Sequence, residues 1–143
     1  MTTPEKILNL ARQVLDIEAT AIHALSARLD LNFARAVELC LACSGRIIVS
    51  GMGKSGHVAG KIASTLASTG TPSFFVHPGE ASHGDLGMIT PQDVVIALSN
   101  SGESPELVAI VPLIKRLGAR LITMTGNPSP PWRAKPISIS TPA

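Results

Sequence analysis

The feature that most constrains the fold is an alternation of short β-rich runs with helical segments from residue 46 onward. The run Asp93–Leu98 is continuously apolar after its first residue, which is typical of a strand covered on both faces of a sheet. Strands that alternate with helices predict an α/β fold, a three-layer sandwich with a doubly wound, mainly parallel sheet of five strands. We expect strands at residues 46–50, 73–76, 93–98, 120–124 and 136–140, with helices at 55–68 and 105–117.

The first third of the chain is predicted to be helical. Apolar residues recur at helical spacing from Ile7 to Leu29, and residues 30–43 continue as a second helix that stops at Ser44-Gly45. We therefore expect an N-terminal helical arm, residues 1–35, packed on an α/β domain of residues 36–143. That domain ends where a further helix would be needed to cover the fifth strand, so we expect it to be truncated at its C-terminus.

Composition excludes several classes of function. The 143 residues include 12 Lys plus Arg and 10 Asp plus Glu, a formal net charge of +2 without clusters, which argues against nucleic-acid binding. No apolar run approaches the roughly 18 residues of a membrane span, and Glu5 and Lys6 interrupt the region where a signal peptide is apolar. We therefore expect a cytoplasmic protein with neither a membrane nor a nucleic-acid partner. Because only 15% of residues are charged, a partner subunit is expected to cover some of the surface.

Residues 99–104, Ser-Asn-Ser-Gly-Glu-Ser, follow the predicted third strand and precede a helix that opens with Ser104-Pro105. A helix N-terminus offers unpaired backbone N–H groups and a partial positive charge, which suit a phosphate. Further donors and a flexible backbone come from Ser99, Asn100, Ser101 and Gly102. An ordinary helix cap is the alternative, but it explains one serine rather than three. The pattern favours a phosphate-binding loop.

The turn at residues 51–56, Gly-Met-Gly-Lys-Ser-Gly, fits the dinucleotide fingerprint G-x-G-x-x-G. However, the second strand ends without the acidic residue that would bind the ribose, since Glu80 comes late. A P-loop is excluded because its first glycine would fall at Ile48. What remains is a tight turn that brings Lys54 and Ser55 to the carboxyl edge of the sheet. Lys54 is there either a ligand for an anionic substrate or a solvated side chain.

Cys40 and Cys43 have the spacing of a redox pair. Redox cysteines gain a low pKa at a helix N-terminus, whereas these lie at the predicted C-terminal end of a helix, where the dipole has the opposite effect. We expect two buried structural thiols.

Three further side chains are candidates for chemistry. His77 and His83 flank the loop after the second strand, but with only acids nearby the set of metal ligands is thin, so acid–base work or substrate contact is equally open. Glu106 lies in the first turn of the helix after residues 99–104. It is either solvated or a base directed at the carbon end of a bound ligand.

Three motifs occur in order: the turn at residues 51–56, His-Gly-Asp-Leu-Gly-Met at residues 83–88, and Leu-Ser-Asn-Ser-Gly-Glu-Ser at residues 98–104. Together they resemble the sugar isomerase (SIS) domain and, more closely, the D-arabinose-5-phosphate isomerase family. The resemblance extends from the N-terminal helices to Gly126-Asn127. It implies the SIS fold for residues 36–143, without the CBS domains that commonly follow in relatives.

The resemblance implies an aldose–ketose isomerase that interconverts D-ribulose 5-phosphate and D-arabinose 5-phosphate through an enediol, in the biosynthesis of Kdo and lipopolysaccharide. This chemistry needs a base and a group that stabilises charge on oxygen, but no redox cofactor. The resemblance also implies a homo-oligomer, a dimer or a tetramer. An alternative is a catalytically incomplete module that binds sugar phosphates, because in relatives a glutamate and a histidine of the site lie beyond the end of this sequence. Dinucleotide binding is a third hypothesis.

The same resemblance assigns roles to individual residues. Lys54, His83 and Glu106 match catalytic positions, with Glu106 for proton transfer and the other two for oxygen stabilisation or ring opening, although these assignments are interchangeable. The phosphate would be held by Ser55, Ser99, Ser101 and Ser104. The substrate would also lie near Gly70, Thr71 and His77, and a zinc that turnover does not require is implied at His77.

Overall fold

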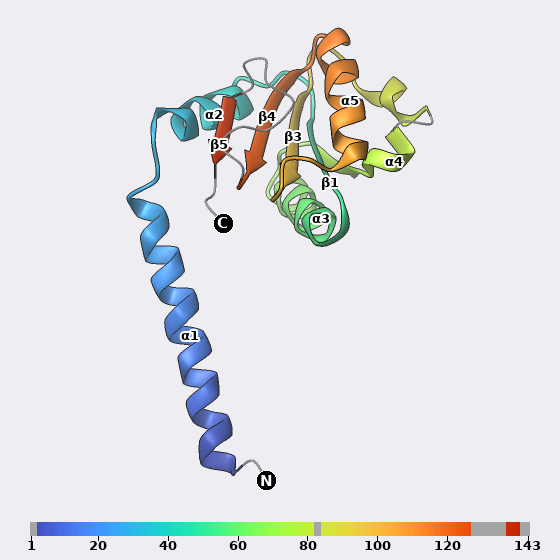
Figure 1. Ribbon diagram of the computed structural model, residues 1–143. Coiled ribbons are helices and arrows are strands. Elements are labelled where there is room, and N and C mark those ends of the chain that lie inside the picture. Colours follow the sequence, from blue (N-terminus) through green and yellow to red (C-terminus); the bar gives the residue numbers. More distant parts are fainter. Residues whose placement is uncertain (1–2, 82–83, 127–136, 141–143) are drawn as a thin grey trace. The chain divides into compact units, whose positions relative to one another are not determined.

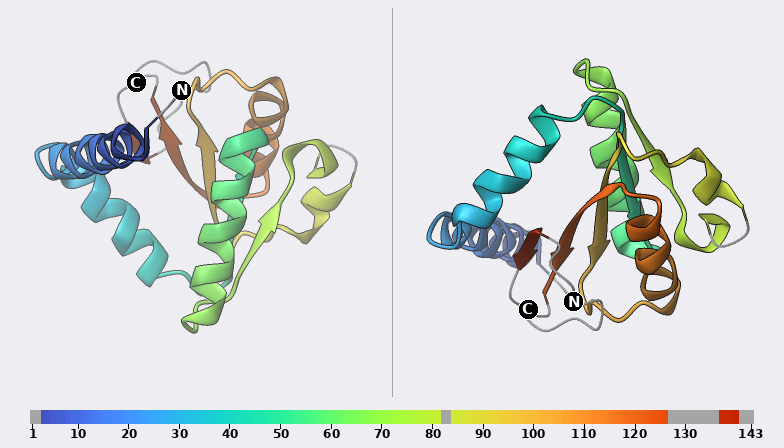
Figure 2. Two further views of the ribbon diagram at one scale, coloured as in Figure 1. Left: turned by 90° about the horizontal axis from the view of Figure 1, so that it is seen from below. Right: turned by 90° about the horizontal axis from the view of Figure 1, so that it is seen from above.

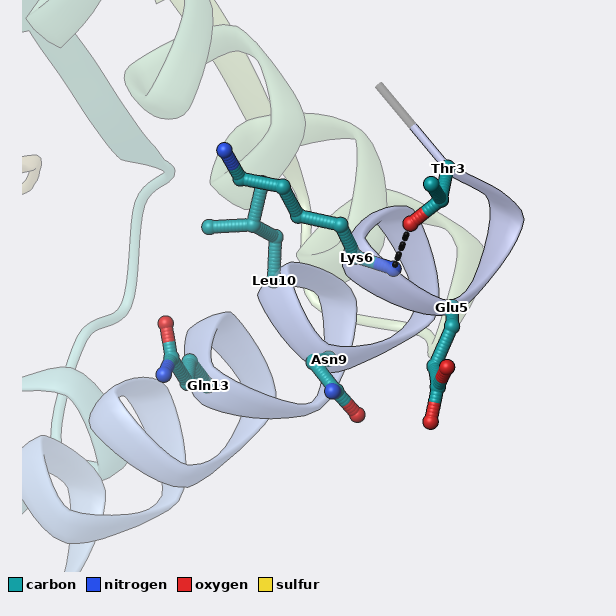
Figure 3. Close-up of a pocket in the computed structure, with 6 residues that line it drawn as sticks. All are labelled: Thr3, Glu5, Lys6, Asn9, Leu10 and Gln13. Atoms are coloured by element: carbon teal, nitrogen blue, oxygen red, sulfur yellow. Dashed lines mark hydrogen bonds between the residues drawn. The ribbon is translucent and has the colours of Figure 1, made fainter. Parts of the chain in front are cut away.

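The computed structural model describes residues 3–81, 84–126 and 137–140. The chain divides into two compact units, Met1–Leu31 and Asn32–Ala143. The first unit is essentially one helix of 23 residues, α1 (Pro4–Ser26). Thr3 caps it, because its Oγ1 accepts a hydrogen bond from the Lys6 amide at 3.3 Å (Figure 3). An open hollow of about 350 Å³ runs along the first turns of α1, and none of the predicted site residues lines it.

Helix α1 is amphipathic, yet none of its residues is buried. Its large aliphatic side chains are all at least 41% exposed. They are Ile7, Leu8, Leu10, Val14, Leu15, Ile17, Ile22 and Leu25. In the part of the chain that the structure describes, no helix combines the length and the apolarity needed to cross a membrane.

In the second unit strands and helices alternate as predicted, with ends within two residues of the expected ones. The strands are β1 (Ile47–Gly51), β2 (Ser73–Val76), β3 (Val94–Ser99), β4 (Arg120–Thr125) and β5 (Ile137–Ser140). The helices are α2 (Leu31–Leu41), α3 (Gly53–Ser68), α4 (Pro78–Ala81) and α5 (Pro105–Arg116), with a 3₁₀ turn η1 (Asp85–Met88).

The five strands form one sheet in the order β2-β1-β3-β4-β5, and every neighbouring pair is parallel. The predicted doubly wound parallel sheet is confirmed. From β1 the chain moves outward to β2 and then crosses back to β3 on the other side of β1. The strand order therefore reverses between β1 and β3, and in such sheets a crevice opens at the carboxyl ends of the two strands.

Helices cover both faces of the sheet (Figures 1 and 2). Because side chains alternate along a strand, β3 contributes side chains to a hydrophobic cluster on each face of the sheet. Val95 packs in the cluster that contains Ile110 of α5, whereas Leu98 packs in the cluster that contains Ala63 of α3 and Ala36 of α2. Helices α3 and α5, which follow β1 and β3, thus lie on opposite faces, and the predicted three-layer sandwich is confirmed.

The buried carboxylate of Asp93 links the amino ends of β1 and β3 through hydrogen bonds. The Asp93 side chain is 1% exposed, and its oxygens accept hydrogen bonds from the amides of Arg46 and Thr90, both at 2.8 Å. The guanidinium of Arg46 lies 3.3 Å from Asp93 Oδ2 and over the ring of Phe74, 5.0 Å from its centre. Burial alone would raise the pKa of Asp93, but these hydrogen bonds outweigh it and hold the pKa below its ordinary value of 3.8.

We expect Asp93→Asn to lower the free energy of unfolding at neutral pH by about 1–3 kcal/mol, because the amide cannot accept from every donor that the carboxylate serves. A carboxyl whose pKa is depressed by folding stabilises the protein above its unfolded pKa and loses that contribution as pH falls through the folded value. Urea titrations of both proteins should therefore show a difference in the free energy of unfolding that is largest above about pH 5 and becomes smaller below about pH 4. A difference independent of pH would contradict this account of Asp93.

The two cysteines are less buried than expected. Both are half-buried free thiols at the edge of the α2–α3 cluster, because Cys43 lies two residues beyond the end of α2. The Cys43 thiol donates to the carbonyls of Gln92 at 3.4 Å and Arg46 at 3.6 Å. Burial, with a smaller contribution from Cys43, raises the pKa of Cys40. A raised pKa disfavours the thiolate that redox chemistry requires, so the structural interpretation of the pair stands.

Candidate phosphate-binding site

The turn after β1 and the loop after β3 lie at the same edge of the sheet, on either side of the point where the strand order reverses. Strands β1 and β3 are neighbours, with Gly51 opposite Leu98 at their carboxyl ends. Residues 51–56 lead into α3, and residues 99–104 lead into α5. The topology therefore brings together the two segments that the sequence singled out.

Residues 99–104, here called the serine loop, fold around the hydroxyl of Ser99. This side chain is 4% exposed, and its Oγ accepts the Gly102 amide at 3.1 Å and lies 3.0 Å from Ser104 Oγ. Gly102 is buried with φ of +70°, a conformation that L side chains rarely adopt. Ser99 thus stabilises the loop through internal hydrogen bonds. The sequence alone did not distinguish this structural role from direct contact with a ligand.

The exposed hydroxyl of the loop belongs to Ser101. Its Oγ accepts the Glu103 amide at 3.2 Å, which leaves the hydroxyl proton to be donated elsewhere. Ser104 is half-buried and occupies the N-cap position of α5, yet its side chain makes no capping hydrogen bond. The simple helix cap, which was the alternative to phosphate binding, is therefore not what the structure contains.

Two helix N-termini at this edge lack side-chain caps. Ser104 does not cap α5, and Met52, at the N-cap position of α3, has no side chain able to do so. The amides of the first turn of each helix are left for another acceptor, and both helix dipoles place partial positive charge at the same edge. Lys54, exposed in the first turn of α3, adds a full positive charge, and Ser55 beside it is half-buried. This arrangement favours an anion.

Close backbone approach explains the glycines of the β1–α3 turn. A Cβ on Gly56 would lie 2.7 Å from the Gly51 carbonyl oxygen, and a Cβ on Gly51 would lie 2.8 Å from the Ser55 carbonyl oxygen. The turn can therefore be this tight only with glycine at both positions. It carries Lys54 directly from the end of β1 into the first turn of α3.

His77 follows β2 at the same edge and is half-buried. Its Nδ1 accepts the Gly79 amide at 3.2 Å, which leaves Nε2 for another partner. Among residues 3–81, 84–126 and 137–140, no group of three metal-ligating side chains occurs. His77 with its described neighbours therefore does not make a zinc site of the usual composition. His83, the other predicted histidine, lies outside the described residues.

Gly70 and Thr71 are not brought to this edge. They follow α3 and precede β2, so they lie at the amino end of that strand, opposite the serine loop. Thr71 instead helps to line an apolar hollow of about 300 Å³ with side chains such as Phe33, Ile96 and Met124. Within one chain these two residues do not join the other candidates.

Glu106 and a backbone hydrogen bond from Gly126 also lie at the carboxyl edge of the sheet. Glu106 is half-buried in the first turn of α5, immediately after the serine loop. The Gly126 amide, one residue beyond β4, donates to the Asn100 carbonyl at 3.0 Å. Sequence reasoning missed this bond, because it depends on β4 lying beside β3.

The reversed strand order and the paired helix N-termini define a doubly wound α/β protein whose carboxyl edge has the features of an anion-binding site. The sequence model of the SIS domain matches residues 40–142. The chain belongs to the SIS domain family.

The chain is similar to proteins named arabinose 5-phosphate isomerase KdsD. It is 61% identical to that of Pseudomonas aeruginosa over 124 residues, 87% of this chain and 38% of that protein. It is 58% identical to that of Escherichia coli over 117 residues, 82% of this chain and 36% of that protein. The chain thus spans less than two fifths of the length of these curated relatives.

Among solved structures, Escherichia coli c3406 in complex with arabinose 5-phosphate has a TM-score of 0.89 and 38% identity, covering 98% of this chain and 75% of that one. The NanR protein of Vibrio vulnificus, at 17% identity and a TM-score of 0.77, shares the fold.

Proposed function

We propose that the chain is an aldose–ketose isomerase that interconverts D-ribulose 5-phosphate and D-arabinose 5-phosphate. The observation that carries the proposal is the pair of uncapped helix N-termini, with Lys54 and Ser101 beside them, where the strand order reverses. The pentose specificity is supported by the likeness to proteins named arabinose 5-phosphate isomerase.

In this proposal the phosphate anchors the sugar. Its oxygens accept hydrogen bonds from the Ser101 hydroxyl and from first-turn amides of α5, while Ser99 and Ser104 hold the loop and Ser55 contributes from α3. Charge-assisted hydrogen bonds of this kind are shorter and stronger than neutral ones, so they fix the orientation of the sugar. The carbon end of the substrate then lies within reach of groups at the same edge of the sheet.

The reaction moves one proton between C1 and C2. A base removes the proton from C1 of the ketose, the electron pair forms the C1–C2 double bond, and the C2 carbonyl opens as its oxygen takes up a proton, which gives an enediol. The carbon proton then returns at C2 while O1 gives up its proton and the C1 carbonyl of the aldose forms. Glu106 is the proposed base. Lys54 and His83 are proposed to stabilise charge on the oxygens or to assist ring opening. We propose no step that requires a metal, and the zinc implied at His77 would be incidental to turnover.

We also propose that the protein is a homo-oligomer, a dimer or a tetramer. Supporting this, the apolar face of α1 is exposed along its whole length. Half-exposed aliphatic side chains in such number are typical of interaction surfaces in solution.

Incubation with ribulose 5-phosphate in deuterated water tests the function. We expect arabinose 5-phosphate that carries deuterium at C2, because the base exchanges its proton with solvent during the enediol step, and NMR detects both product and label. Binding without product or label would leave a phosphosugar-binding module. If neither sugar phosphate bound, both interpretations would be rejected.

A further inference from the structure

The end of β4 governs the direction of a peptide group in the serine loop. Ser99 pairs with Thr125 as the last register pair of β3 and β4. Beyond this pair the regular ladder ends, because the Ser99 carbonyl accepts a hydrogen bond from the Gly102 amide within the loop. The Gly126 amide donates instead to the Asn100 carbonyl, at 3.0 Å. The Asn100 carbonyl is therefore directed toward β4.

A trans peptide points its carbonyl and its N–H in opposite directions. The described residues contain no cis peptide, so the Ser101 N–H points away from β4. Strands β1 and β4 flank β3, and this direction is the side of β1. There the described pairing ends at Gly51 opposite Leu98, because the chain has turned into α3. The Ser101 amide thus faces the space between the serine loop and the N-terminus of α3, and Ser101 is exposed.

We infer that Gly126 is a positioning residue: its backbone amide fixes the Asn100–Ser101 peptide so that the Ser101 N–H donates to the phosphate of the substrate. Without this bond the peptide is free to rotate, and the Asn100 carbonyl oxygen can turn its partial negative charge toward the anion. The inference rests on the proposed function and adds to it a contribution from β4, a strand that carries none of the catalytic candidates.

Gly126→Pro tests the inference because proline has no amide hydrogen, and Gly126→Ala is the matched control because it keeps one. We expect the proline variant to raise KM for arabinose 5-phosphate at least about tenfold, which corresponds to about 1.4 kcal/mol. We expect kcat to stay within about threefold, since the reacting carbons are remote from the phosphate. The alanine variant should retain KM, and thermal unfolding should show that both variants are folded.

A second readout uses the unaltered protein. Titration of ¹⁵N-labelled protein with arabinose 5-phosphate should shift the Ser101 amide proton downfield, as a new hydrogen bond to an anion does. If the sugar phosphate binds and this resonance does not move, the inference is wrong while the proposed function survives. Equal losses in the proline and alanine variants would overturn it too, since the amide would not be the cause. If no sugar phosphate binds the unaltered protein, the proposed function fails and the inference with it.

Discussion

Replacing Glu106 with Gln is expected to lower the rate of isomerisation by about 10²- to 10⁴-fold, the usual contribution of a positioned general base. The amide has nearly the same size as the carboxylate but cannot accept the substrate proton. Glu106 is half-buried in the first turn of α5, directly after the serine loop, so it lies close to the proposed phosphate. Removing its negative charge should leave the affinity for arabinose 5-phosphate unchanged or higher.

Turnover of Glu106→Gln is compared with that of Glu38→Gln, a change of the same chemistry at an exposed position on α2. The deuterium-exchange rate in ribulose 5-phosphate and the dissociation constant from calorimetry separate the chemical step from binding. If exchange stayed within about twofold of the unaltered protein, a change below roughly 0.5 kcal/mol in the barrier, Glu106 would not be the base.

Replacing Lys54 with Met is expected to lower kcat/KM by about 10²- to 10³-fold, the range found when one charge-stabilising donor is removed from an active site. Lys54 is exposed, so the loss of its charge should not disturb the core of the second unit, and unfolding should be nearly unchanged. Methionine keeps a long flexible side chain and removes only the ammonium group.

Lys61→Met is the matched control, since Lys61 is also exposed on α3 and lies seven residues further from its N-terminus. The division of the loss between the two kinetic constants identifies the role of Lys54. A lower kcat at constant KM indicates stabilisation of the developing enediolate, whereas a higher KM at constant kcat indicates a contact with the phosphate. Equal activity of the two variants would remove Lys54 from the site.

Local sequence patterns predicted the helices and strands well, because apolar runs and helix-terminating or helix-starting residues act over only a few residues. The apolar run at residues 93–98 became β3, shifted by one residue, and Pro105 opens α5 as its fixed backbone geometry favours. The placement of Lys54 and the serine loop at one edge also followed, since carboxyl ends of parallel strands meet at the same edge.

Contacts between strands could not be read in the same way. Nothing in local periodicity says that β1 lies between β2 and β3, and the pairing of Arg46 with Asp93 depends on that order. The bond between Gly126 and Asn100 depends equally on β4 lying beside β3. The inward role of Ser99 was equally inaccessible, because β3 is buried on both faces and alternation along it does not distinguish an inward side chain.

The proximity of Gly70 and Thr71 to the substrate stays a prediction. Both precede β2, so connectivity alone assigns them to the amino edge of the sheet. Their predicted proximity to the substrate came only from the resemblance, and one chain does not supply it. A site that included them would need groups from elsewhere in an oligomer.

We expect a phosphate ester to bind between the serine loop and the N-terminus of α3. A crystal structure of the protein soaked with arabinose 5-phosphate tests it most directly. Phosphate oxygens should lie within about 3 Å of Ser101 Oγ and of first-turn amides of α5, the ordinary length of a hydrogen bond. Phosphate density at another edge of the sheet, or an empty serine loop at saturating ligand, would contradict it.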